Sequence, residues 1–203
     1  MPELKSLYSE ISACQRCSLG RSRTKSVPGE GPEDAAIMFI GEAPGFHEDQ
    51  QGRPFVGAAG HFLEELLASI NMTRRDVYIC NVIKCRPPGN RDPMPNEIQA
   101  CAEYLQKQIA HIKPRLIVTL GRYSMANYFP QVSISKIHGQ AKRVGGVLVL
   151  PLYHPAAALH QPRYKADIEA DFKKIPVLLK EAAAVDEPPA PAGPKGAEQL
   201  SLF

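Results

Sequence analysis

The sequence predicts an α/β fold in three layers, with a central four-stranded, mainly parallel sheet between two layers of helices. Four short runs are apolar throughout, as strands buried on both faces are. They span residues 35–40, 77–83, 115–121 and 145–155. Segments with the spacing of amphipathic helices alternate with these runs. Sheets of this kind bind their ligands at the carboxyl ends of the strands.

Helices are expected around these strands. The segment 58–70 places Phe62, Leu63, Leu66 and Leu67 at helical spacing, and Asn96 is a suitable N-cap for the helix that follows the second strand. The expected helices span residues 3–13, 58–70, 96–112, a short stretch from Arg122, and 163–180.

Composition indicates one globular domain, which we place at residues 1–181. The chain has 203 residues, of which 44% are hydrophobic and 22% charged, as in ordinary soluble proteins. No apolar run approaches the roughly 18 residues that a membrane helix needs, and the N-terminus lacks the pattern of a secretory signal. We therefore expect a cytoplasmic protein with no membrane partner.

The C-terminal residues differ from the rest of the chain. Residues 182–198 are rich in Pro, Ala and Gly and are expected to form a disordered tether. The chain then ends in QLSLF, residues 199–203. This pentapeptide resembles the peptide with which many bacterial proteins bind the replicative sliding clamp, and the resemblance assigns that contact to Gln199, Leu200, Leu202 and Phe203. The alternative is a C-terminus that docks on its own domain.

Basic residues gather in segments that are expected to be loops. The formal net charge is +3, and a basic face would suit a polyanion such as a nucleic acid. Scattered solubilising charge explains the composition equally well. The basic segments contain Arg16, Arg21, Arg23 and Lys25, then Lys84, Arg86 and Arg91, and finally Lys136, Lys142 and Arg143.

Four of the five cysteines have the pattern of metal ligands. Cys14 and Cys17 form a Cys-x-x-Cys pair, and Cys85 and Cys101 form a second, wider pair. Four thiolates suit either one tetrahedral zinc ion or one iron–sulfur cluster, and the spacing does not choose between them. Cys80 lies within an expected strand and is interpreted as a buried small apolar residue.

The loop after the first strand predicts a binding pocket. Residues 41–57 read GEAPGFHEDQQGRPFVG, so that the chain leaves the strand through Gly and Pro and then sets Phe55 among polar residues. Asn81 lies at the end of the second strand, and His154 at the end of the last one. Together these residues suggest a pocket for one flat, polar ring.

Four sequence elements, in order, carry a resemblance to a known family: GEAPG with GRPFVG, CNVIKCRPP, HGQAKR, and YHPAAAL. With Cys-x-x-Cys upstream, this set resembles the family 4 uracil-DNA glycosylases, the iron–sulfur branch of their superfamily, from Cys14 to about Arg163. The resemblance implies an enzyme of base excision repair. Such an enzyme rotates uracil out of DNA and hydrolyses its N-glycosidic bond, which leaves an abasic site.

The resemblance also implies roles for the pocket residues. Phe55 would stack on the base, and the amide of Asn81 would match uracil O4 and N3–H while mismatching cytosine. The turn at Gly41, Glu42 and Ala43 would offer backbone N–H groups to uracil O2, and His154 would stabilise the leaving anion there. Glu42 is the first candidate for activating water. Glu48 and Asp49 are further candidates.

The remaining implications concern the cofactor and the DNA. A 4Fe-4S cluster would be held by Cys14, Cys17, Cys85 and Cys101. The substrate would be uracil in single- or double-stranded DNA, and the enzyme a nucleoid-associated monomer. The expected DNA contacts are Arg86, Arg91, Lys136, His138, Lys142 and Arg143.

Two other functions stay open. One is a catalytically inactive, clamp-associated protein that binds DNA lesions. The other is a zinc-stabilised α/β hydrolase that binds a nucleotide at the Gly41 turn.

Overall fold

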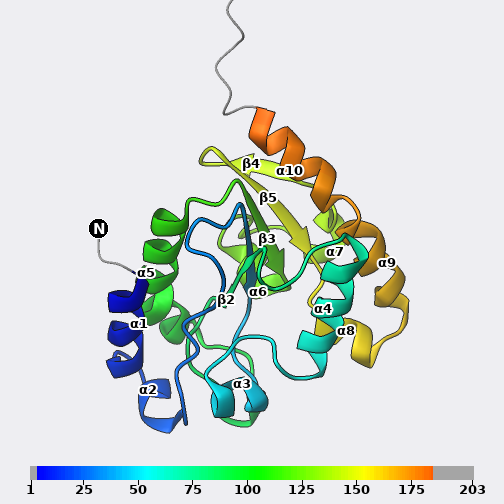
Figure 1. Cartoon of the computed structure of the whole chain (residues 1–203). Helices are drawn as coiled ribbons and strands as arrows, with labels where there is room; N and C mark the ends of the chain where they lie inside the picture. The colour runs from blue at the N-terminus through cyan, green and yellow to red at the C-terminus, as the bar shows by residue number, and fades with distance from the viewer. Residues whose placement is uncertain (1–3, 185–203) are drawn as a thin grey trace, which may run out of the picture.

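A five-stranded sheet runs through the centre of the computed structural model, which describes residues 4–184 (Figure 1). The strand order is β2-β1-β3-β5-β4. Strands β2, β1, β3 and β5 are parallel to one another, and β4 pairs antiparallel with β5 at one edge. The expected α/β class is therefore confirmed. The strands are β1 (Ile37–Gly41), β2 (Tyr78–Asn81), β3 (Leu116–Leu120), β4 (Lys142–Val144) and β5 (Val147–Leu152).

Helices cover both faces of this sheet. The longest, α5, is an 18-residue helix, and within residues 4–184 no helix has both the length and the apolar character that a membrane crossing requires. The helices are α1 (Leu4–Ala13), α2 (Leu19–Ser22), α3 (Phe46–Gln51), α4 (Ala58–Ser69), α5 (Pro95–Ile112), α6 (Arg122–Ala126), α7 (Ile134–Ile137), α8 (Pro155–His160), α9 (Arg163–Phe172) and α10 (Ile175–Ala184), with one 3₁₀ turn, η1 (Pro88–Asn90).

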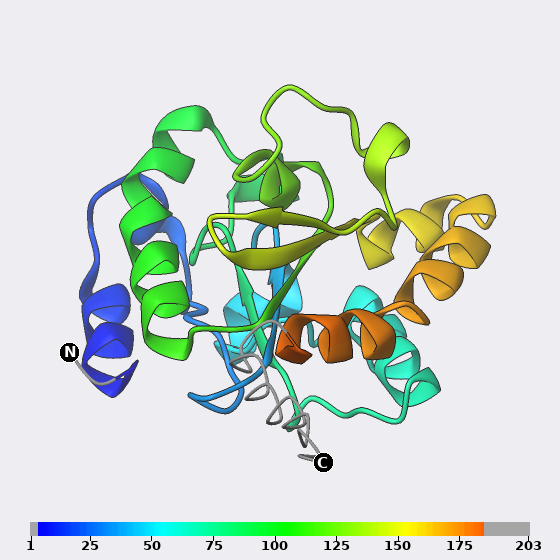
Figure 2. The same cartoon turned by 90° about the horizontal axis from the view of Figure 1, so that it is seen from above.

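Two hydrophobic cores hold the layers together, one on each face of the sheet. Figure 2 shows the helices that cover the two faces. Helices α4, α9 and α10 pack on one face, where the rings of Phe39 and Phe172 stack with centroids 5.6 Å apart. Helices α1 and α5 cover the other face through Leu7, Ile11 and Leu105. Each fully buried side chain of this kind stabilises the fold by about 1.5–3 kcal/mol.

The sheet has one strand more than the sequence predicts. Lys142, Arg143 and Val144 form β4, whose side chains are exposed or half-buried. An edge strand with a polar, solvent-facing sequence gives no continuous apolar run, which is why the sequence predicts a loop at these residues.

The helix predicted at 163–180 is instead two helices. It breaks between Phe172 and Ile175, where α9 ends and α10 begins. Pro176 explains the break, because proline lacks the N–H that a helix interior needs and is tolerated only in the first turn.

Two predicted boundaries also differ. The N-cap of α5 is Met94 and not Asn96, and the carboxylate of Glu97 accepts a hydrogen bond from the Met94 N–H at 2.8 Å. Helix α10 continues through Ala184 and buries Ala182, so the domain extends past the boundary expected at 181. The rest of the expected tether and the pentapeptide at 199–203 lie outside the described residues.

Candidate active site

The strand order brings the predicted pocket residues together at the carboxyl ends of the parallel strands. Gly41 ends β1 and Asn81 ends β2, and the two are cross-strand partners. His154 follows β5 by two residues. A cavity of about 670 Å³ opens at these strand ends. Its lining includes Glu42, Ala43, Phe55, Asn81 and His154, together with Glu48, Arg91 and Asp92.

Gly41 has no side chain, and this allows Asn81 and Phe55 to pack closely against it. A Cβ atom at this position would lie 2.3 Å from Asn81 Oδ1 and 2.6 Å from Phe55 Cζ. Both distances are shorter than atoms can tolerate. Any side chain here would therefore force the Asn81 amide and the Phe55 ring apart.

Phe55 is held in an unusual backbone conformation. Its φ of 53° lies in the left-handed region, which costs a non-glycine residue about 1 kcal/mol or more. Arg74 reaches across to hold it, because its Nη1 donates to Phe55 O at 2.8 Å and its Nη2 donates to Pro54 O at 2.5 Å. The Phe55 ring stacks beside His154, with ring centroids 5.5 Å apart and planes 24° from parallel.

Glu48 fastens the loop that carries Phe55. Its Oε1 accepts hydrogen bonds from the N–H groups of Val56 at 2.8 Å and Gly57 at 2.9 Å, and its Oε2 accepts one from Gly45 at 3.1 Å. The carboxylate thus joins the two ends of the loop. This arrangement explains the role of Glu48 as a structural clasp, which the sequence did not reveal.

Asp49, the other further candidate for a base, is also committed to the fold. It is buried, and its Oδ1 accepts a hydrogen bond from the Thr24 N–H at 2.9 Å. It does not belong to the cavity lining, in contrast to Glu42.

Asn81 presents an unsatisfied acceptor. The residue is 2% exposed, and its Oδ1 has no hydrogen-bond partner among the described residues. Leaving a buried polar atom unpaired costs about 1–3 kcal/mol, so such atoms are uncommon and call for a ligand or a functional reason. Because Asn81 lines the cavity, a donor on a bound molecule can satisfy this oxygen.

His154 is a neutral hydrogen-bond donor. Its Nδ1 accepts a hydrogen bond from the Ala156 N–H at 3.1 Å, so the single proton of the neutral ring is on Nε2. Desolvation lowers the pKa of His154 to about 4, with a smaller opposing effect from Glu48. The ring is therefore uncharged near neutral pH and offers Nε2–H.

Glu42 has a carboxyl group with strongly perturbed acidity. Desolvation and the negative charge of Asp92 raise its pKa to about 7, and the nearby charge of Arg122 opposes this shift. Arg122 itself forms an ion pair with Asp92. A carboxyl group with this pKa can both accept and release a proton near neutral pH.

Asp92 and Arg122 were missed by sequence reasoning. Asp92 lies in the loop after β2, and Arg122 begins α6 after β3. Neither belongs to a motif, and only the strand order, which places β1 between β2 and β3, brings both charges near Glu42.

The expected DNA-contact residues fall into two groups. Arg91 lines the cavity and pairs with the buried Glu97 at 2.7 Å. Arg86 lies nearby, because its guanidinium stacks over the Phe46 ring at 5.0 Å and donates to Asn90 Oδ1 at 2.7 Å. These two arginines are thus held at the cavity rim.

His138 does not belong to the cavity lining and is fixed by two neighbouring side chains. Its Nδ1 lies 2.7 Å from Asp171 Oδ2, and its ring lies against Tyr153, the neighbour of His154, with centroids 4.5 Å apart. Lys174 Nζ donates to Asp171 Oδ1 at 2.7 Å and to Gly139 O at 3.0 Å. The loop after α7 is therefore tied to the break between α9 and α10.

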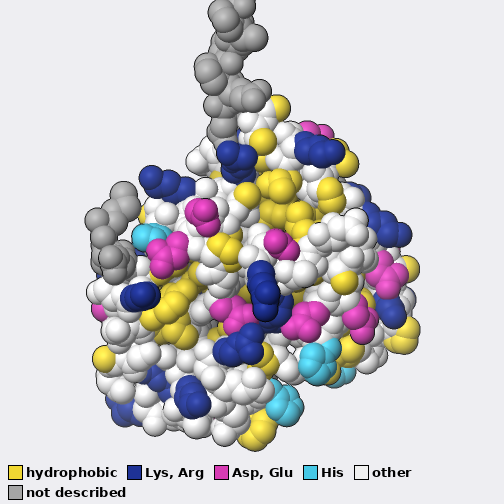
Figure 3. Space-filling view, viewed as in Figure 1, with side chains coloured by type: hydrophobic (Ala, Val, Ile, Leu, Met, Phe, Trp, Pro, Cys, Tyr) yellow, Lys and Arg dark blue, Asp and Glu magenta, His cyan; other side chains and the backbone are white. Residues whose placement is uncertain are grey.

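The second group lies elsewhere. Lys142 and Arg143 are exposed on β4, and Arg143 pairs with Leu148 near the amino end of β5, away from the cavity. Lys136 is exposed on α7. Figure 3 shows basic and acidic side chains interspersed on the face in view, with histidines along its lower edge. On this face the charge is mixed and forms no single basic patch.

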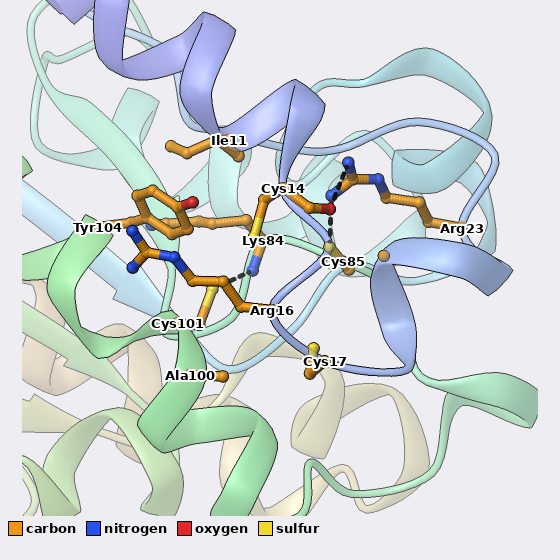
Figure 4. Close-up of a pocket in the computed structure, with 11 residues that line it drawn as sticks. Ile11, Cys14, Arg16, Cys17, Arg23, Lys84, Cys85, Ala100, Cys101 and Tyr104 are labelled. Atoms are coloured by element: carbon orange, nitrogen blue, oxygen red, sulfur yellow. Dashed lines mark hydrogen bonds between the residues drawn. The ribbon is translucent and has the colours of Figure 1, made fainter.

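The four predicted metal ligands line one cavity (Figure 4). They come from separate segments: Cys14 follows α1, Cys17 precedes α2, Cys85 follows β2, and Cys101 lies in α5. Within residues 4–184, no group of three Cys, His, Asp or Glu side chains has the arrangement of ligands to a single ion. Cys80 is fully buried and is not part of this lining.

The sulfur atoms in this cavity accept hydrogen bonds from nitrogen donors. Arg23 Nη1 donates to Cys85 Sγ at 2.9 Å, and the Lys84 N–H donates to Cys101 Sγ at 3.3 Å. Burial raises the pKa of Cys85 and raises that of Cys101 to about 11. As free thiols these two groups would be protonated near neutral pH, and a bound metal would displace the protons.

Comparison with known proteins agrees with this geometry. Residues 28–175 match the uracil DNA glycosylase superfamily. A type-4 uracil-DNA glycosylase from Archaeoglobus fulgidus is 47% identical over 184 residues, which are 86% of this chain and 92% of the relative. The type-4 uracil-DNA glycosylase of Thermotoga maritima is 47% identical over 161 residues, which are 77% of this chain and 84% of the relative.

A type-5 uracil-DNA glycosylase from Pyrobaculum aerophilum is more distant, at 28% identity over 173 residues, which are 76% of each chain. The extent of the type-4 matches and their higher identity place the sequence on that branch. The chain belongs to the uracil-DNA glycosylase superfamily and, within it, to the type-4 uracil-DNA glycosylases.

Proposed function

We infer that this protein is a uracil-DNA glycosylase of base excision repair, which hydrolyses the N-glycosidic bond of uracil in DNA and leaves an abasic site. Its family supports this function. The structural observation that carries the inference is the unpartnered Oδ1 of buried Asn81 in a cavity shared with Phe55 and His154. A DNA substrate also accounts for the expected location at the nucleoid.

Asn81 would read the edge of the extruded base. Its Oδ1 can accept N3–H of uracil while its Nδ2 donates to O4. Cytosine presents an acceptor at N3 and a donor at C4, so the same amide would oppose it on both atoms. Phe55 would stack on the ring, a contact worth about 1–3 kcal/mol per base.

His154 would stabilise the leaving group. When the glycosidic bond breaks, negative charge collects on uracil, including O2, and positive charge collects on the sugar. A neutral histidine with its proton on Nε2 can donate to O2 without losing that proton. The N–H groups of the Glu42–Ala43 turn would add donors aimed at the same oxygen.

Glu42 would accept the proton of the attacking water. The two glutamates of the cavity differ in this respect, because Glu48 is occupied by three backbone N–H groups. Glu42 has no comparable hydrogen bonds among those that the described residues form, and its raised pKa of about 7 suits a general base. Its carboxylate would also stabilise the cationic sugar.

Arg86, Arg91 and His138 are proposed to contact the DNA backbone around the cavity. Arg91 lines the cavity, Asn90 holds Arg86 near its rim, and Asp171 holds His138 on the loop after α7. Backbone contacts of this kind position the duplex without reading its sequence. Lys136, Lys142 and Arg143 would contribute only if DNA also follows the β4 edge.

The first test is release of free uracil from a labelled oligonucleotide. Asn81→Ala and His154→Ala should each lower kcat/KM by about 10²-fold or more, because each removes a donor or acceptor aimed at the reacting base. Exposed Asn127→Ala and His61→Ala serve as matched controls and should retain activity. Tight binding of uracil-containing DNA by the wild type without any uracil release would instead identify an inactive lesion-binding protein.

The second test is the pH dependence of kcat/KM. Glu42 must be ionised to accept a proton, so activity should rise with pH through about 7. His154 stays neutral over this range and should not contribute to the change. Glu42→Gln should lower kcat/KM by about 10²-fold and flatten the profile, whereas exposed Glu65→Gln should leave it unchanged. An unaltered profile in Glu42→Gln would remove Glu42 from this role.

We further propose that Cys14, Cys17, Cys85 and Cys101 hold a 4Fe-4S cluster. Four sulfurs around one cavity, with two N–H···S hydrogen bonds, suit such a cluster. When bound, the cluster would join α1 and α2 to the segment after β2 and to α5.

The cluster is tested by metal analysis of protein purified without oxygen. We expect about four iron and four sulfide per chain and a brown colour that is lost on oxidation. Cys85→Ser should lose most of the iron, because a hydroxyl replaces a thiolate ligand, while Cys80→Ser should keep it. Stoichiometric zinc in place of iron would refute the proposal.

The pentapeptide at 199–203 is proposed to bind the sliding clamp. Its support is the sequence alone: apolar Leu200, Leu202 and Phe203 end a segment rich in Pro and Ala. Such a contact would raise the local concentration of the enzyme at newly made DNA.

Deletion of residues 199–203 should abolish binding to immobilised clamp. The same deletion should leave uracil release from short oligonucleotides within about twofold, because the cavity lies within residues 42–160. Replacement of the five residues by Gly and Ser provides a length-matched control. Clamp binding that survives both changes would contradict this assignment.

A further inference from the structure

Lys84 is a lysine in the interior of the protein. The sequence places it among the basic residues expected to face a polyanion, but it is only 1% exposed. Its Nζ donates to the backbone carbonyl of Asn81 at 2.7 Å and to Gln108 Oε1 at 2.6 Å. The ammonium therefore lies directly behind the residue that faces the base cavity.

The hydrogen-bond partners of this ammonium are uncharged. Both acceptors are neutral, and among the described residues no carboxylate forms an ion pair with it. A buried charge without an opposite charge destabilises a fold by several kcal/mol. Lys84 also lines the cavity of the four cysteines, so the thiolates of a bound cluster would supply an opposite charge, while the Nζ hydrogen bond fixes the Asn81 carbonyl.

The Lys84 ammonium is part of a longer buried network. Gln108 on α5 donates from Nε2 to Pro28 O at 2.8 Å and to the Tyr78 hydroxyl at 2.9 Å. The Tyr78 hydroxyl in turn lies 2.6 Å from that of Tyr8 on α1. The carbonyl of Asn81 is thus connected through Lys84 to the two helices that flank the cysteine cavity.

The hydrogen bond acts at the end of the β1–β2 ladder. The last pair of the ladder is Gly41 and Asn81, and the N–H groups of Val82 and Ile83 continue the pairing to Gly41 O at 3.0 Å and Glu42 O at 3.2 Å. Lys84 fixes the Asn81 carbonyl at this last position. The backbone of Asn81 determines where its side-chain amide points, so this bond also orients the amide.

We propose that Lys84 is a positioning residue for uracil recognition, which holds the Asn81 amide in the orientation that reads the base. The proposal rests on the uracil-DNA glycosylase function inferred above. Lys84 touches neither base nor sugar, and it acts through the Asn81 carbonyl while Gln108 holds its ammonium in place.

The test compares two DNA ligands of wild-type and variant protein. One duplex carries a non-hydrolysable fluorinated deoxyuridine, and the other carries a tetrahydrofuran abasic-site analogue without a base. Lys84→Met should weaken binding to the deoxyuridine duplex by about tenfold or more, the range expected when a hydrogen bond to a charged group is lost. Binding to the abasic duplex should stay within about twofold, because no base is read there.

Two further variants keep the test decisive. Gln108→Met leaves Lys84 and Asn81 in place but removes the support of the ammonium, so it should give the same selective loss if Lys84→Met fails to fold. Lys107→Met is the matched control, since this lysine on α5 is only partly buried and pairs with Glu103 at 2.9 Å. Iron content and thermal melting report whether each variant keeps its fold.

The Asn81→Ala variant distinguishes failure of the Lys84 proposal from failure of the proposed base recognition by Asn81. In its background Lys84→Met should cause no further loss, because Lys84 acts only through Asn81. Additive losses, an equal loss on both duplexes, or wild-type binding by both Lys84→Met and Gln108→Met would overturn the role of Lys84. Wild-type binding of the deoxyuridine duplex by Asn81→Ala would overturn the proposed base recognition itself.

Discussion

The cavity depends on the close approach of two backbone segments at Gly41. The parallel pairing of β1 and β2 sets Gly41 beside Asn81, and the loop from Glu48 to Gly57 then folds back to set Phe55 against the same glycine. Each neighbour is fixed separately: Phe55 by Arg74 and Glu48, and Asn81 by Lys84. The cavity wall is therefore rigid before any ligand arrives, which lowers the entropy lost on binding.

Environment separates the roles of otherwise similar groups in this wall. Glu42 and Glu48 both line the cavity, but Glu48 accepts three backbone hydrogen bonds while Glu42 is desolvated near Asp92. His154 is kept neutral by burial, so it can donate a hydrogen bond and carries no charge. Groups with perturbed acidity, here Glu42 and His154, are a common feature of sites that transfer protons.

Much of the fold could be predicted because its four parallel strands are buried on both faces and appear as continuous apolar runs. The polar edge strand β4 has no such signal. The places of Asn81 and His154 at strand ends were enough to predict that they share a cavity. The spacing of four cysteines was enough to predict that they lie around a second cavity. The clasp by Glu48 depends on backbone N–H groups that only the folded loop presents. Lys84 was misplaced because lysine is almost never fully buried.

The contacts of Lys174 give the C-terminal helices a mechanical connection to the substrate side of the protein. Lys174 occupies the break before α10 and bonds both Gly139 and Asp171, and Asp171 in turn bonds His138 beside Tyr153. Asp171 thus links Lys174 at the start of α10 to His138, whose ring lies against Tyr153. One continuous series of side-chain contacts therefore holds the C-terminal helices to the loop after α7 and to the end of β5.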